Sequence, residues 1–233
     1  MSSEGEIFRV CQLTMTDKTM TDETMTNKII LLLNPTYDYA SDDDVMNLIR
    51  KYGRVVFCQE YNNHINWLPE GVLDIKCVGV ISQPIVNIPP TTIAIEIENP
   101  TFNLPIDNLQ SIESLVIKSR LFNQTPEHIP PTCKNVAIIS KCFNYPLDYF
   151  PDTVETISLD IFDIFNTTKI PKNLKTLNLQ NSLYSTKTLK AFQAKFPTIR
   201  IIYFERQITS RQLDYFRMTG RKPDGWPIDV EIQ

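Results

Sequence analysis

A repeat of 20 to 21 residues occurs six times in the chain, from about Leu68 to Leu179. Each copy follows the pattern Pro-x-x-apolar-x-x-apolar-x-apolar, with a leucine in place of proline in the third copy and Thr92 at the first apolar position of the second. The copies begin at Pro69, Pro89, Leu109, Pro130, Pro151 and Pro171, in steps of 20, 20, 21, 21 and 20 residues. A sequence period in this range is typical of a solenoid, in which each structural unit stacks on the next.

The apolar positions of each copy predict one short strand. The last two are separated by a single variable residue, as in a strand with one buried face. One such unit cannot bury its apolar face alone, so neighbouring units must share a core. Proline lacks the backbone donor that a helix interior uses, and a 20-residue unit leaves no room for a full helix on the return. We therefore expect the return segments to be extended or 3₁₀-like.

A Phe-Asn pair repeats in phase with these units, and a Tyr-Asn pair resembles a divergent copy before them. The aromatic ring is expected to fill the core, and the Asn to hydrogen-bond backbone groups where the chain leaves the strand. Stacked copies would then form a ladder. The alternative is that these Asn side chains bind a ligand. The pairs are Tyr61-Asn62, Phe102-Asn103, Phe122-Asn123, Phe143-Asn144 and Phe165-Asn166.

Two of these segments carry a resemblance to a known family. Phe102-Asn103-Leu104-Pro105-Ile106 and Phe143-Asn144-Tyr145-Pro146-Leu147 resemble the FNIP repeat, a relative of the leucine-rich repeat. The resemblance covers roughly residues 61 to 183 and implies a protein of social amoebae or of the large DNA viruses that infect amoebae. Members of the family often carry an amino-terminal F-box that recruits a ubiquitin ligase, and residues 1–60 show no convincing F-box pattern.

These patterns together predict an α/β repeat solenoid that is leucine-rich-repeat-like. Short parallel strands would line the concave face, the convex side would be extended or 3₁₀, and small α/β caps would close both ends. We divide the chain into a disordered tail (1–28), an amino-terminal cap with a strand and a helix (29–60), the repeats (61–183), and a carboxy-terminal α/β cap with its tail (184–233). Three internal methionines in the first segment also permit later translation starts.

The two caps have recognisable elements. In the first, residues 28–33 predict a strand, and a helix is expected to start with Ser41 as its cap, to run to Tyr52 and to end at Gly53. Residues 55–58 would form the first strand of the stack. The aspartates at 42–44 suit a helix start better than a metal site. In the second cap, we expect helices at 186–196 and 209–218 around a strand at 199–204.

Composition argues against several classes of function. A net charge of -4 and a pI near 5.3 predict no general attraction to nucleic acid or to an anionic membrane. No apolar run is long enough to span a membrane, and the start lacks the apolar segment of a secretion signal. Cys77 and Cys133 occupy core positions of the repeat and predict reduced thiols in the cytoplasm, the host cytoplasm if the protein is viral. His64 and His128 are expected in solvated turns. With six glycines and no catalytic or metal-binding motif, we expect neither an enzyme nor a cofactor.

The variable residues of the strands predict a protein-binding surface. Val116, Ala137 and Ile139 would form an apolar centre, and Glu96, Glu98, Lys118 and Asp160 a charged rim. The proposed contact residues are Lys76, Glu96, Glu98, Val116, Lys118, Ala137, Ile139, Ser158, Asp160 and Asn178, with Arg221 and Trp226 as further anchors in the tail. The leading hypothesis is a non-enzymatic interaction scaffold. The alternatives are a substrate receptor of a ubiquitin ligase and a self-associating structural or virion protein.

Overall fold

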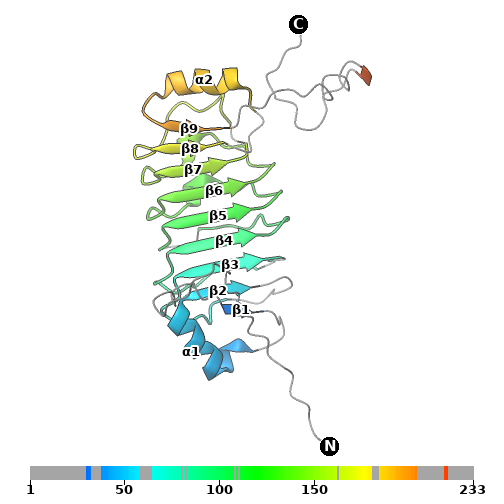
Figure 1. Ribbon diagram of the computed structural model, residues 1–233, viewed down its shortest axis with the longest axis vertical. Helices are drawn as coiled ribbons and strands as arrows, with labels where there is room; N and C mark the ends of the chain where they lie inside the picture. Colours follow the sequence, from blue (N-terminus) through cyan, green and yellow to red (C-terminus); the bar gives the residue numbers. More distant parts are fainter. Residues whose placement is uncertain are drawn as a thin grey trace, which may run out of the picture.

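Within the part of the chain that the structure describes, one parallel sheet of nine strands, with the strands in chain order, forms the body of the protein (Figure 1). The computed structural model describes residues 30–32, 38–57, 65–79, 81, 83–107, 109, 111–161, 163–179, 184–203 and 218–219. The strands are β1 (Ile30–Leu32), β2 (Arg54–Phe57), β3 (Asp74–Val78), β4 (Ala94–Glu98), β5 (Ser114–Lys118), β6 (Asn135–Ile139), β7 (Thr156–Leu159), β8 (Thr176–Asn178) and β9 (Arg200–Ile202). Two helices, α1 (Asp43–Tyr52) and α2 (Thr186–Lys195), lie at opposite ends of the sheet.

The register of the strands follows the sequence repeat. Ile75 lies opposite Ile95, Ile95 opposite Leu115, and Leu115 opposite Val136, so equivalent positions of successive copies become neighbours. All the predicted apolar positions of the six copies are buried, and none is more than 5% exposed. A slip of one residue would turn every strand's apolar face to solvent, so this burial fixes the register.

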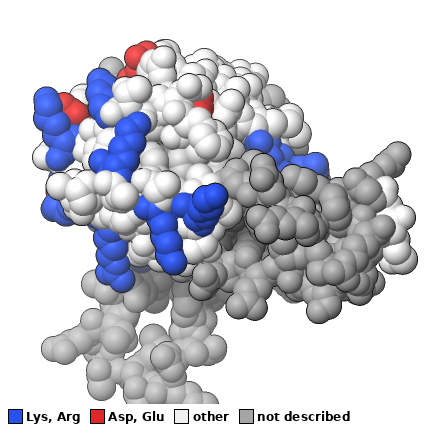
Figure 2. Space-filling model, turned by 90° about the horizontal axis from the view of Figure 1, so that it is seen from above, with Lys and Arg blue, Asp and Glu red and all other residues white. Residues whose placement is uncertain are grey.

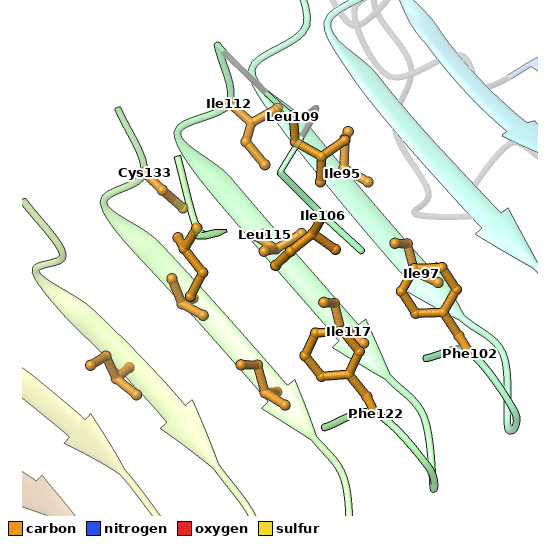
Figure 3. Close-up of a cluster of buried hydrophobic side chains, with 14 of the residues drawn as sticks. Ile95, Ile97, Phe102, Ile106, Leu109, Ile112, Leu115, Ile117, Phe122 and Cys133 are labelled. Carbon is orange, nitrogen blue, oxygen red and sulfur yellow. The ribbon is translucent and has the colours of Figure 1, made fainter. Parts of the chain in front are cut away.

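The core lies between the sheet and the return segments. Figure 3 shows Ile95 and Leu115 of the strands facing Ile106, Leu109 and Ile112 of the return side. Two return segments contain a 3₁₀ turn, η3 (Pro126–His128) and η4 (Leu147–Tyr149). The prediction of an extended or 3₁₀ return side is therefore confirmed for these units.

Phenylalanines of three successive units stack beneath the turns that follow the strands. Phe102, Phe122 and Phe143 are at most 1% exposed, and successive ring centroids lie 5.9 and 6.4 Å apart with nearly parallel planes. The Asn that follows each of the first two rings links its unit to the next, because Asn103 Oδ1 accepts a hydrogen bond from the Asn123 N–H at 2.9 Å. Asn123 Oδ1 accepts from the Asn144 N–H at 3.3 Å. The predicted aromatic and Asn ladders are thus confirmed for these three copies.

The fourth Phe-Asn pair does not join the ladders, which corrects the prediction. Phe165 is 71% exposed, and Ile164, which lies 21 residues after Phe143, is buried in its place. Asn166 donates instead to the Asp163 carboxylate, through its backbone N–H at 3.0 Å and its side-chain amide at 2.6 Å. The Tyr61-Asn62 copy lies outside the described residues.

Helix α1 begins one residue later than predicted. Asp42, not Ser41, is its N-cap, and the Asp42 carboxylate accepts hydrogen bonds from the N–H groups of Asp44 and Val45. The short 3₁₀ segment η2 (Tyr39–Ser41) contains Ser41, whose hydroxyl donates to Asp38. The helix ends as predicted, with Gly53 in the left-handed region at φ 66°. A Cβ at Gly53 would lie 2.9 Å from the Gly71 carbonyl oxygen, so the helix end fits closely against the first repeat.

Helix α2 is capped by Ser185, whose hydroxyl accepts from the Thr188 N–H at 3.1 Å. Its buried residues Leu189 and Phe192 face the core, and β9 follows as the last strand of the sheet. Residues 204–217 and 220–233 lie outside the described residues, and with them nearly all of the helix predicted at 209–218.

Candidate interaction surface

The strand positions that alternate with the core positions form three rows on the open face of the sheet. Strand pairing places Asp74, Ala94, Ser114, Asn135, Thr156 and Thr176 in one row, and Lys76, Glu96, Val116, Ala137, Ser158 and Asn178 in the next. Val78, Glu98, Lys118 and Ile139 continue as the third row. Variable residues of successive strands, which the sequence predicted to form one surface, are therefore neighbours in space. We call the outward side of β2 to β8 the open face, since α1 packs at the β1 end and α2 against β9.

Charged residues on β3 to β5 form a network across the open face. Lys118 Nζ lies 2.6 Å from Glu96 and 3.6 Å from Glu98, and Lys76 Nζ lies 3.0 and 3.2 Å from the same two carboxylates. Burial alone would raise the pKa of Glu96, but hydrogen bonds from Lys118 and Lys76 outweigh it and hold this pKa below its ordinary value. Burial likewise opposes the charge of Lys76, and its bonds to Glu96 and Glu98 nevertheless raise its pKa.

The network changes how the predicted charged rim must be understood. Glu96, Glu98 and Lys118 were expected to surround an apolar centre, but Glu96 and Glu98 lie together on β4, where Lys76 and Lys118 balance their charge. On the other side of the apolar centre, β7 and β8 present small polar residues such as Ser158 and Asn178. Asp160 follows β7 and is half-buried. The open face therefore has a charged half with no net charge and a small-residue half.

Val116 and Ala137 lie opposite each other at the middle of the open face, and both are half-buried. Ile139 lies one row away, opposite Lys118. The three apolar residues thus come from two adjacent strands, β5 and β6, as the sequence predicted. Arg221 and Trp226, proposed as anchors in the tail, lie outside the described residues.

A hollow of about 310 Å³ lies on the open face between β2 and β5. Its lining includes Arg54, Val56, Asp74, Lys76, Glu96 and Val116. Arg54 Nε lies 2.7 Å from Asp74, so each charged residue in the lining has an oppositely charged neighbour. Three of the predicted contact residues, Lys76, Glu96 and Val116, therefore line one concavity.

Sequence reasoning missed the contribution of β2 to this hollow. Arg54 and Val56 lie opposite Asp74 and Lys76, so the open face extends one strand before the six copies. The alternation of Arg54-Val55-Val56-Phe57, with half-buried and buried residues in turn, was the signal that could have placed them there. Leu73 and Ile93, which immediately precede β3 and β4, were also missed and are 44% and 46% exposed.

Other features of the described residues bear on chemistry. Burial raises the pKa of the Cys77 thiol to about 12 and that of Cys133 to about 11, so neither thiol is poised for reaction at neutral pH. His128 is exposed in η3, as predicted, whereas His64 lies outside the described residues. Within the described ranges, no three His, Cys, Asp or Glu side chains are grouped so that they could hold a metal ion. No helix in the same ranges is long and apolar enough to cross a membrane.

Comparison of the chain with protein-family models, with curated proteins and with solved structures found no match. The resemblance to FNIP repeats therefore stays a prediction.

Proposed function

We propose that this chain is a leucine-rich-repeat-like solenoid of the cytoplasm that acts without catalysis, as a scaffold that binds a protein partner on the open face. One observation carries the proposal: the register places the variable residues of successive strands side by side in continuous rows, on a face against which neither α1 nor α2 packs. A stack of short units displays such a surface as a consequence of its architecture.

The composition of the face favours a protein partner over a highly charged ligand. Arg54, Lys76 and Lys118 are matched on the face by Asp74, Glu96 and Glu98, so the charged half carries no net charge. The apolar residues Val116, Ala137 and Ile139 lie beside this charged half. Apolar residues bordered by paired polar groups are the usual anatomy of a protein interface. Binding here should therefore depend on shape and apolar burial, and only weakly on salt.

The ion network also suggests how the face discriminates between partners. A protein that covers Glu96 must leave Lys76 and Lys118 paired or supply acceptors of its own, because a buried unpaired charge is strongly destabilising. Partners that present an apolar or hydrogen-bonding surface above Val116, and that leave the network in place, satisfy this condition. Partners that place an unpaired cation or anion above Val116 do not satisfy this condition.

Affinity purification of the tagged protein from amoebal lysate, combined with substitutions on the face, tests the proposal. The wild type and a Leu121→Asp control should retain the same stoichiometric protein, whereas Val116→Asp and Ile139→Asp should lose it. Leu121 is a fair control because it is 48% exposed in the turn after β5 and belongs to none of the rows of the open face. Circular dichroism must show that all variants fold. Retention of the partner by both face variants would overturn the proposal, and recovery of the chain alone would favour self-association instead.

A further inference from the structure

The sequence range 164–203, at the carboxy-terminal end of the described stack, has basic residues and no acidic ones of its own. Residues 164–203 contain six lysines and one arginine, and neither Asp nor Glu. The chain as a whole has 23 Lys and Arg and 27 Asp and Glu, so the remaining residues carry 16 positive and 27 negative charges. The net charge of -4, which predicted no attraction to nucleic acid, is thus the sum of a basic region, residues 164–203, and an acidic remainder. We call the basic residues of 164–203 the basic end; they are Lys169, Lys172, Lys175, Lys187, Lys190, Lys195 and Arg200.

Four of these seven cations, Lys187, Lys190, Lys195 and Arg200, have no acidic partner among the described residues, and Lys169 interacts electrostatically with Asp152. Lys172 pairs with Asp152 and Lys175 with Glu155, each at 2.6 Å, whereas the other five form no ion pair within the described part of the chain. Figure 2, which views this end of the molecule, shows Lys and Arg side chains spread over the surface with few acidic ones among them. This arrangement differs from the open face, where every cation that lines the hollow has an acidic neighbour.

Two of the three cations of α2, Lys187 and Lys190, do not stabilise the helix, whereas Lys195 lies in the last turn, where the helix dipole favours a cation. Helix α1 has Asp43 and Asp44 in its first turn and basic residues in its last, the arrangement that the helix dipole favours. Helix α2 has no acidic residue in its first turn and carries Lys187 there. Lys187 and Lys190 are three positions apart on the exposed side of α2, where like charges repel each other. Because these positions weaken the helix, their charge points to a ligand.

The basic end extends over several sides of the stack. Arg200 lies opposite Thr176 and so continues an open-face row, whereas Lys187 and Lys190 lie on the side of α2 opposite to the buried Leu189 and Phe192. Lys175 immediately precedes β8 and pairs with the preceding unit. A flat bilayer can contact only the charges that lie in one plane. A flexible polyanion can follow all of them.

An exposed aromatic ring lies in the segment just before Lys169. Phe165, excluded from the core, is 71% exposed. The Lys195 ammonium donates to the Thr167 carbonyl oxygen at 2.6 Å, so the last turn of α2 lies against the segment that runs from Phe165 to Lys169. Cations combined with exposed aromatic rings are the means by which proteins bind single-stranded nucleic acid, through phosphates and stacked bases.

We propose that the basic end binds single-stranded nucleic acid, with Lys187, Lys190 and Arg200 contacting phosphates and Phe165 stacking on a base. Lys187, Lys190 and Phe165 lie outside the open face, whereas Arg200 continues one of its rows on β9. The proposal does not depend on the function proposed for that face. These residues would contact the phosphate backbone of the nucleic acid and the faces of its bases, so little sequence preference is expected.

Fluorescence anisotropy of a labelled oligonucleotide of roughly 16 nucleotides, titrated with the full chain at several salt concentrations, tests this proposal. The affinity should fall steeply with salt. Lys187→Gln/Lys190→Gln should reduce the slope of log K against log salt by about 1.4, or about 0.7 for each phosphate that the variant no longer neutralises. Phe165→Ala should weaken binding about tenfold with an unchanged slope, because stacking releases no counterions. Lys141→Gln, which removes an exposed lysine from the turn after β6, should change neither quantity.

Several outcomes would overturn the proposal. The first is the absence of oligonucleotide binding at low salt, and the second is an unchanged slope in the double variant. Equal affinity for a polyglutamate of matched charge would show that the basic end accepts any acidic chain. Binding to phosphatidylserine vesicles that the oligonucleotide does not displace would show that it is a membrane site. Equal weakening of binding in the Lys141→Gln control would place the binding residues elsewhere.

Discussion

The side-chain oxygen of Asn103 accepts a hydrogen bond from the backbone N–H of Asn123, in the next unit of the stack, at 2.9 Å. The same oxygen and the Asn103 carbonyl also accept from the Gln124 amide, at 3.1 and 2.8 Å. These hydrogen bonds satisfy backbone groups where the chain turns away from the sheet. Their position is exposed, so they act as a link between units rather than as part of the core.

Replacement of Asn103 with alanine should therefore lower the stability of the stack modestly. The Asn123 N–H would bond to water instead, and we expect a loss of about 0.5–1.5 kcal/mol in the free energy of unfolding. Asn173→Ala is the matched control, because Asn173 is also exposed, in the turn before β8, and its side chain forms no hydrogen bond to another described residue. Urea unfolding of the two variants checks this, and equal stabilities would contradict a structural role for the ladder.

Phe122 and Phe165, which both belong to Phe-Asn pairs, should lose very different amounts of stability on truncation. Phe122 is completely buried between Phe102 and Phe143, so Phe122→Ala should cost about 3–5 kcal/mol. Phe165→Ala should change the free energy of unfolding by less than about 0.5 kcal/mol, because the ring is 71% exposed. Thermal and urea unfolding measure both, and a large loss at Phe165 would place that ring in the core.

The start of α1 offers a second matched pair. Asp42→Ala removes the carboxylate that accepts from two N–H groups of the first turn and should cost about 1 kcal/mol. Ser41→Ala removes only the exposed bond to Asp38 and should cost less. If Ser41→Ala proved the more damaging in urea unfolding, the cap would be Ser41 and the assignment of Asp42 would be wrong.

The ion network predicts a pH dependence at Glu96. The pKa of Glu96 in the folded protein lies below its ordinary value of 4.5, because the bonds from Lys118 and Lys76 outweigh the effect of burial. A lowered folded-state pKa contributes stability above the unfolded-state pKa, and that stability is lost as the pH falls through the folded-state value. Glu96→Gln should therefore be less stable than the wild type near pH 7, by at most about 1 kcal/mol since the pair is partly solvated.

This difference should disappear once the pH lies below the lowered pKa, and added salt should reduce it at neutral pH. Unfolding curves of the wild type and of Glu96→Gln across this acidic range provide the measurement. A difference that persisted unchanged in strong acid would show that Glu96 stabilises the sheet by packing and not by its charge.

The core and the strand register could be predicted from the sequence because both follow from one repeated constraint. Every unit must bury the same three positions, and steps of 20 or 21 residues leave one alignment of the strands, as Ile75 and Ile95 illustrate. The prediction that Phe165 fills the core failed because the Phe-Asn pair recurs there one residue out of phase. Ile164 occupies the buried position instead. The repeat period of the whole array therefore predicted the buried positions better than the local Phe-Asn motif did.

The open face could be predicted as a set of rows, but its charge pattern could not. Whether Lys118 surrounds Val116 or bonds to Glu96 depends on the reach of side chains across strands, which the one-dimensional pattern does not contain. The extension of the face onto Arg54 was missed because β2 precedes the six copies that define the period. The basic end was missed because charge was averaged over the whole chain.

The central claim is that a protein partner binds the open face at Val116. Calorimetric titration of the partner recovered by affinity purification, against the wild type, Val116→Asp and Leu121→Asp, tests it most directly. We predict that Val116→Asp weakens the affinity at least about tenfold, since a buried unpaired carboxylate would lie in the apolar part of the interface, whereas Leu121→Asp leaves it unchanged. An equal affinity for all three folded proteins would contradict the account.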